Sequence, residues 1–138
     1  LTGKQIDALQ KHVNSGGTLV VNNALGLATF HQAVVREMRR ASPQSDLALL
    51  PHSHDIFRNL NSIQRVKYTP TLMKDKGELL QGRPVLFGAT VGGRLCLLYS
   101  PYDLEGGWNE VRYPLSRGYQ SASVKQLGCN IIMYAMEH

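Results

Sequence analysis

The sequence has little cysteine and no long hydrophobic run, and each shortage excludes a class of protein. Two cysteines in 138 residues, Cys96 and Cys129, do not make a disulfide framework. Both are flanked by apolar residues, so we expect both to be small buried side chains. No apolar run approaches the roughly 18 residues that a membrane-spanning helix requires. We therefore expect neither a disulfide scaffold nor a membrane span.

Acidic residues are scarce relative to basic ones. The sequence has 10 Asp and Glu against 15 Lys and Arg, which gives a formal net charge of +5. Such an excess can indicate a nucleic-acid partner, but here the basic residues are dispersed. The densest group, Arg36, Arg39 and Arg40, closes a predicted helix, where cations offset the helix dipole. We therefore expect no nucleic-acid partner.

Linkers, internal repeats and low-complexity segments are absent as well. At 138 residues the chain has the length of one ordinary domain. A chain of this length buries roughly two-thirds of its unfolded surface, which is enough for a single hydrophobic core. We predict one domain over residues 1–138.

Three segments carry the period of an amphipathic helix. Apolar residues recur at intervals of three and four near residues 3–14, 27–40 and 123–136, and we predict a helix in each segment. Thr2 and Gln5 fit a capping box at the start of the first helix. The third segment has a broad apolar face, which is typical of a helix that packs on a sheet.

Short β-rich runs separate these helices. Residues 18–21 and 47–50 are almost continuously apolar, which favours buried parallel strands, and residues 63–68 alternate weakly enough to form another strand. In the stretch 85–98, Gly92-Gly93 joins two β-rich runs, as in a tight hairpin turn. We predict an α/β fold: a doubly wound, mostly parallel sheet with helices on both faces and one antiparallel hairpin.

Polar side chains gather where two predicted strands end. Asn22 and Asn23 follow the first strand, and Ser100 and Asp103 follow the last one. Because the carboxyl ends of parallel strands form one edge of an α/β sheet, where ligands bind, we expect these side chains to meet there. We expect Trp108, the only tryptophan, to lie over or beside them, as a loop anchor or as a ligand platform. These five residues are the predicted ligand-binding site.

A catalytic site would require a nucleophile with a base within reach. Neither Cys96 nor Cys129 follows the sharp strand-to-helix turn that carries an amidotransferase nucleophile. Ser100 or Asp103 with His54 would form a triad-like set for a hydrolase. The alternative is that Ser100 and Asp103 bond to loop amides and that His54 caps a neighbouring element. We predict no catalytic residue, with His54, Ser100 and Asp103 as the alternative.

The five histidines do not form a metal-binding pattern. His52 and His54 stand close together, but no third ligand follows at a metal-site spacing. We predict neither a metal nor another cofactor.

Four stretches form an ordered set of motifs: GGTLVVNN at 16–23, HDIF at 54–57, GRLCLLYSPYDL followed by GW within 93–108, and LGCNIIMYA at 127–135. Their order resembles the bacterial family known as domain of unknown function 4159, over almost the whole chain. The resemblance implies a fold like that of class I glutamine amidotransferases, a flavodoxin-like arrangement. It implies no particular activity, because the function of the family is unsettled.

Two positions depart from that family. The chain has Asn22-Asn23 where relatives commonly have acidic residues, and Asp55 where they have a proline after the histidine. A role that needs carboxylates after the first strand is therefore not implied. Members are often parts of larger, sometimes exported proteins, so the resemblance implies a longer parent protein and allows a place outside the cytoplasm.

Two functional hypotheses follow. The first is a non-catalytic ligand-binding or protein-interaction module, whose partner is a small ligand or another domain of the parent protein. Its basis is the missing nucleophile. The alternative is a hydrolase that uses Ser100 or Asp103 with His54 at the carboxyl edge of the sheet. Self-association through the edge of the hairpin at 85–98 would give a homo-oligomer.

Overall fold

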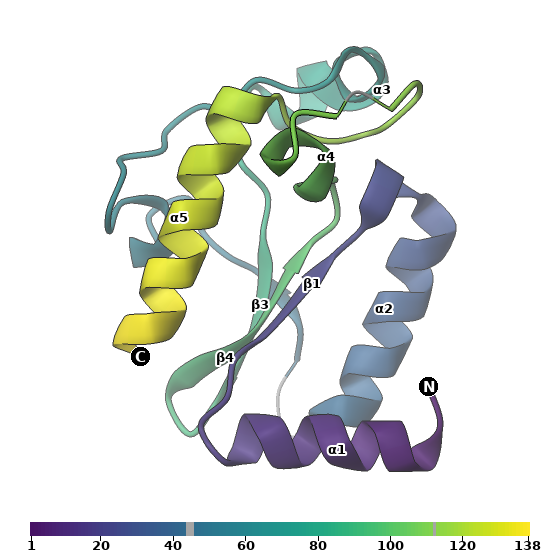
Figure 1. The fold of residues 1–138 in the computed structure, drawn as a ribbon, viewed down its shortest axis with the longest axis vertical. Helices are drawn as coiled ribbons and strands as arrows, with labels where there is room; N and C mark the ends of the chain where they lie inside the picture. Colours follow the sequence, from purple (N-terminus) through teal and green to yellow (C-terminus); the bar gives the residue numbers. More distant parts are fainter. Residues whose placement is uncertain (44–45, 112) are drawn as a thin grey trace.

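The computed structural model describes residues 1–43, 46–111 and 113–138. A four-stranded sheet lies between groups of helices (Figure 1). In chain order the elements are α1 (Gly3–Asn14), β1 (Leu19–Asn22), η1 (Ala24–Gly26), α2 (Ala28–Ala41), β2 (Ala48–Leu49), η2 (Asp55–Phe57), α3 (Pro70–Leu80), β3 (Phe87–Val91), β4 (Arg94–Ser100), α4 (Glu105–Trp108) and α5 (Ser121–Glu137).

The three predicted helices are confirmed as α1, α2 and α5. Thr2 and Gln5 form the predicted capping box, in which the main-chain N–H of Gln5 donates to the Thr2 hydroxyl at 3.2 Å. The last turn of α2 contains Arg39 and Arg40, as expected. In the part of the chain that the structure describes, no helix combines the length and hydrophobicity of a membrane span.

The sheet is mixed, with the strand order β1-β4-β3-β2. Among the described strands, β1 and β4 are the parallel pair, and β3 is antiparallel to both β4 and β2. The expectation of a mostly parallel sheet was wrong, because the hairpin occupies both central positions. The two-residue strand β2 pairs only with Phe87 and Gly88 of β3, so self-association through the hairpin edge stays a prediction. The edge strands β1 and β2 are also less buried than expected, since Val20 is 42% exposed and Leu49 is 55% exposed.

The hairpin turn is the one that the sequence predicts. Gly92 has φ of 60° and Gly93 has φ of 79°. Two consecutive positive φ angles match the right-handed twist of the strands that they join, and glycine adopts them without steric cost. Two glycines therefore form the turn between β3 and β4, whose register shifts once, between Ala89 and Thr90.

Separate hydrophobic clusters cover the two faces of the sheet. On β4, Leu97 and Tyr99 belong to one cluster and Leu98 belongs to the other, as the alternation of a strand requires. The first cluster includes Val13 of α1 and Val34 of α2. The second lies under α5 (Figure 1). The expected coverage of both faces by helices is confirmed.

The segment between η2 and β3 differs most from the prediction. Residues 63–68 do not form a strand, because Tyr68 makes only an isolated bridge, to Tyr119. The helix α3 that follows was not predicted. Thr69 is its N-cap and Pro70 its first residue, a common helix start. The apolar side chains Leu72, Met73, Leu79 and Leu80 of α3 do not recur at intervals of three or four, so the apolar period that reveals a helix is missing.

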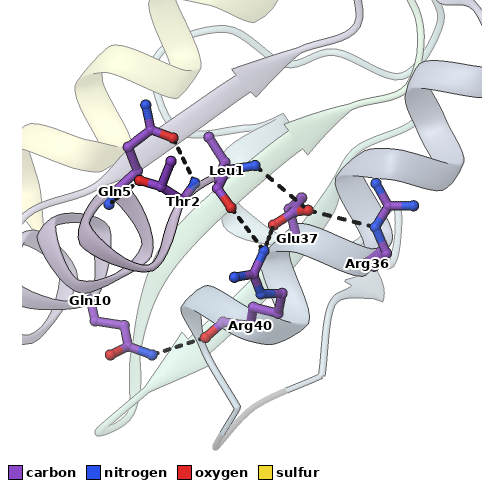
Figure 2. A network of polar contacts seen from close by, with 7 residues as sticks. All are labelled: Leu1, Thr2, Gln5, Gln10, Arg36, Glu37 and Arg40. Atoms are coloured by element: carbon purple, nitrogen blue, oxygen red, sulfur yellow. Dashed lines mark hydrogen bonds and ion pairs between the residues drawn. The ribbon is translucent and has the colours of Figure 1, made fainter.

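A polar network joins α1 to α2 (Figure 2). Arg40 donates to the Glu37 carboxylate at 2.6 Å and to the Leu1 carbonyl, and its own carbonyl accepts from Gln10. Arg36 lies 3.6 Å from the same carboxylate. Desolvation raises the pKa of Glu37, but the Arg40 hydrogen bond and the nearby positive charges outweigh it and lower the pKa. The two helices are therefore fixed to one another both at Leu1, before α1, and at Gln10 within it.

Asn130 is fully buried in α5 and holds the loop after η2. Its Nδ2 donates to the carbonyls of Ile56 and Asn61 at 2.9 Å, and its Oδ1 accepts from the Asn61 amide at 2.9 Å. Buried main-chain groups are costly to leave without partners. This one side chain therefore fixes the loop against the helix.

Replacing Asn130 with alanine should lower the free energy of unfolding by about 2–4 kcal/mol, because main-chain groups of Ile56 and Asn61 lose their partners. The control is Gln126→Ala, an exposed position on the same helix, with an expected change within about 0.5 kcal/mol. Urea denaturation of both variants measures the difference. Equal losses would contradict the role assigned to Asn130.

Candidate functional site

The ends of β1 and β4 lie side by side at the carboxyl edge of the sheet. Asn22 pairs with Ser100 in the strand register, and the main-chain N–H of Asn23 donates to the Ser100 carbonyl at 3.0 Å. The Asn22 Nδ2 donates to Asp103 Oδ1 at 3.0 Å, and Asn22 Oδ1 accepts from the Leu104 amide at 2.9 Å. The predicted meeting of the two strand ends is confirmed, and Asn22 with Asp103 forms its direct contact.

Most polar groups at this meeting point bond within the protein. Asp103 is 4% exposed, and its Oδ1 also accepts from the Glu105 amide at 3.0 Å. Its Oδ2 lies 3.5 Å from the Ser116 hydroxyl. The Ser100 hydroxyl is buried and donates to the Tyr102 carbonyl at 2.6 Å. These bonds are those of loop-forming residues, one of the two alternatives that the sequence leaves open.

His54 does not join Ser100 and Asp103. Its Nδ1 accepts from the Ile56 amide at 3.1 Å as the cap of η2, and its ring lies 5.4 Å from that of Tyr134 near the end of α5. Burial lowers the pKa of His54, which the Asp55 charge partly offsets. The hydrolase set of His54, Ser100 and Asp103 is therefore not assembled. The imidazole lies beside Tyr134 near the carboxyl end of α5, whereas the segment after Asp103 contacts α5 at Val124, near its amino end.

Trp108 closes the short helix α4, which begins two residues after Asp103. Its Nε1 donates to the Val124 carbonyl at 2.7 Å, and a Cβ at Gly128 would lie 2.6 Å from the indole nitrogen. The indole is thus seated on α5, where it has the contacts of a loop anchor.

The two cysteines differ in their surroundings. Cys96 is fully buried in β4, where its Sγ donates to the Ala89 carbonyl at 3.4 Å and burial raises the pKa of the thiol. Cys129 is exposed, so the expectation that it is buried was wrong. It lies on α5 on the side away from the core, although its neighbours in the sequence are apolar. Neither thiol follows a strand-to-helix turn.

A groove of about 740 Å³ opens at the carboxyl edge, beside the meeting point of β1 and β4. We call it the edge groove. The turn after β1, α2, α3 and the ends of the other strands contribute its lining: Asn23, Gly26, Leu27, Ala28, His31, Leu49, His52, Asp75, Lys76, Leu79, Leu80, Gln81, Arg83, Val85, Phe87, Pro101, Tyr102 and Arg117. It has an apolar and aromatic part together with imidazole, guanidinium and ammonium groups.

A hydrogen-bonded chain connects the floor of the edge groove to the core. Asn23 is fully buried, and its Nδ2 donates to the Leu27 carbonyl at 2.8 Å and to the Tyr99 hydroxyl at 3.3 Å. The same hydroxyl lies 3.1 Å from His31 Nδ1. Burial raises the pKa of Tyr99, so the phenol keeps its proton. The chain presents His31 to the groove in a fixed orientation.

The charges of the edge groove are unevenly partnered. Arg117 Nε lies 2.5 Å from Asp75 Oδ2, which neutralises that pair. Lys76 and Arg83 form no ion pair with any residue of the described ranges. The lining therefore carries an excess of positive charge.

A second cavity, of about 610 Å³, lies between the start of α3 and the segment around α4. Asp103 is among its lining residues, whereas Asn23 lines the edge groove. The predicted site residues thus border two cavities. Within the described residues, no group of three or more His, Cys, Asp or Glu side chains could hold a metal ion.

Sequence reasoning missed most of the edge groove. His31, Tyr99 and Phe87 read as ordinary helix and strand residues, and Lys76 lies on a helix that was not predicted. Of these groove residues, only Asn23 is indicated by the sequence, because a polar residue directly after an apolar strand marks the end of that strand.

The chain belongs to a family of unsettled function. The family model described as Domain of unknown function (DUF4159) matches residues 1–136. No curated protein matches the chain.

Asp103→Asn should change the free energy of unfolding by only about 1 kcal/mol, because an amide oxygen in the place of Oδ1 keeps the bonds from Asn22 and Glu105. Asp103→Ala removes both acceptors and should cost about 2–3 kcal/mol. Denaturant unfolding compares the two variants. If Asp103→Asn lowered the free energy of unfolding as much as Asp103→Ala does, the negative charge, rather than the acceptor geometry, would be what stabilises the loop.

Ellman's reagent should modify one thiol per native chain, because Cys129 is exposed and Cys96 is fully buried with a raised pKa. The second thiol should react only when the chain unfolds. Cys129→Ser should abolish the reaction of the native protein. Rapid native reaction of the serine variant would mean that β4 opens readily.

Proposed function

We propose that this member of the DUF4159 family is a non-catalytic module that binds a small ligand in the edge groove. The observation that carries the proposal is the groove itself, which lies at the carboxyl edge of the parallel pair and has both apolar and polar lining. Ligand sites in α/β proteins are concave, mostly apolar and equipped with a few fixed polar groups. Asn23, Tyr99 and His31 supply such a group.

The contacts at the strand ends support a role without catalysis. The Ser100 hydroxyl is buried and donates to a carbonyl, so it has no base to activate it. His54 Nδ1 caps η2, and the hydrogen-bond partner of the Ser100 hydroxyl is the Tyr102 carbonyl. A hydrolase would need a nucleophile, a base and an orienting group in contact, and these residues supply none of the required pairs.

A segment of a larger parent protein is a second candidate occupant of the edge groove. Leu49 and Leu79 line the groove and are 55% and 76% exposed, which favours an apolar partner that covers them. This candidate agrees with a single domain that serves as part of a longer chain.

We further propose that the scaffold is a short form of the glutamine amidotransferase-like fold, supported by the parallel pair between helical layers.

Filling the edge groove should abolish binding. Ala28 is exposed at the start of α2 and lines the groove, so Ala28→Trp should occupy it without disturbing the core. The measurement is the shift of the His31 and Tyr102 amide signals in ¹⁵N NMR spectra when benzoate, benzamide or benzyl alcohol is added at millimolar concentration. We expect shifts in the unmodified chain and none in the variant.

The matched control is Ala122→Trp, an exposed position in the first turn of α5 that lines neither cavity. It should respond to the probes as the unmodified chain does. Shifts that persist in Ala28→Trp, or no shift with any probe in the unmodified chain, would rule out the edge groove as the site.

A further inference from the structure

We infer that the edge groove receives an oxyanion, a carboxylate or phosphate group, on the Nε2–H of His31, in a lining that also carries the charges of Lys76 and Arg83. The inference rests on the proposed function and specifies its ligand. Main-chain groups of Leu27 determine where the protons lie in the hydrogen-bonded chain of Asn23, Tyr99 and His31.

The orientation of the Asn23 amide is fixed by the main chain of Leu27. The Leu27 N–H is a donor, so its partner at 3.0 Å must be Asn23 Oδ1. The Leu27 carbonyl is an acceptor, so its partner at 2.8 Å must be the Asn23 NH₂ group. The NH₂ group therefore also faces the Tyr99 hydroxyl oxygen, which accepts from it.

The Tyr99 proton is then left for His31. Tyr99 is fully buried, and its hydroxyl has one proton to donate. His31 Nδ1 lies 3.1 Å from the hydroxyl oxygen. In the neutral imidazole Nδ1 accepts this proton, and the ring carries its own proton on Nε2. The structure thus assigns a single tautomer to His31, with one N–H left to bind a ligand.

The other groups of the groove select the charge of that ligand. Lys76 and Arg83 line the same groove, and neither forms an ion pair with a described residue. The one carboxylate of the lining, Asp75, is already paired with Arg117. Donors and positive charges therefore exceed the available acceptors, which favours an anionic oxygen group. Phe87 and Tyr102 provide apolar surface for the rest of the ligand.

The test compares probes of similar shape and different charge. Benzoate and phenyl phosphate should bind the 138-residue chain about tenfold more tightly than benzamide and benzyl alcohol, measured from ¹⁵N NMR titrations. Equal affinity of benzamide and benzoate in the groove would overturn the inference and leave the proposed function standing. The absence of groove shifts with every probe would overturn both.

Two lysine substitutions on α3 test whether the charge of Lys76 itself contributes to benzoate binding. Lys76→Gln should weaken benzoate binding about threefold to tenfold and leave benzamide binding unchanged. Lys74→Gln is the control, an exposed lysine of the same helix that does not line the groove. Equal effects of the two substitutions on benzoate would contradict a specific role of Lys76.

The tautomer has its own readout. The imidazole ¹⁵N signals of neutral His31 should report a proton on Nε2, and Tyr99→Phe should allow a mixture of tautomers with weaker benzoate binding. A proton on Nδ1 in the unmodified chain would overturn the assignment, whatever the effect of the substitution on stability.

Discussion

The attachment of β1 to β4 depends on polar bonds beyond the ends of both strands. β1 has four residues and β4 as its one neighbour in the described sheet, so main-chain pairing alone holds it weakly. Asn22 and Asn23 extend the attachment in opposite directions, because successive side chains of a strand alternate between faces. Asn22 bonds to Asp103 and Leu104, and Asn23 bonds to Leu27 and Tyr99. The end of one strand thus fixes both the loop after β4 and the start of α2.

The local features of the fold were predictable and the arrangement of the strands was not. Thr2 with Gln5 starts a helix, and Gly92-Gly93 turns a chain, because the determining contacts lie within a few residues. The apolar run that ends at Val21 looks buried on both sides, yet it forms an edge strand. Strand order is set by which strands pair across the whole domain, and no residue of β1 indicates that its second edge has no partner strand in the described sheet.

The candidate site was predictable only as a place. A polar side chain at a strand end signals hydrogen bonds, but the sequence does not say whether the partner is a ligand or another loop. Ser100 and Asp103 have their partners within the protein. The edge groove, by contrast, is lined from segments spread between residues 23 and 117, so it exists only after the chain has folded. His31 is a typical example, since in the sequence it is one polar residue of a helix.

The amides at positions 22 and 23 connect the attachment of β1 with the chemistry of the groove. A carboxylate at position 22 would stand about as close to the buried Asp103 carboxylate as the amide does, at 3.0 Å, and the two like charges would repel each other. A carboxylate at position 23 could still accept from the Leu27 amide, but it could not donate to the Leu27 carbonyl or to Tyr99. The Tyr99 proton would then turn toward that carboxylate, and His31 Nδ1 would lose its donor. The same amide that holds the end of β1 therefore determines which nitrogen of His31 carries a proton into the groove.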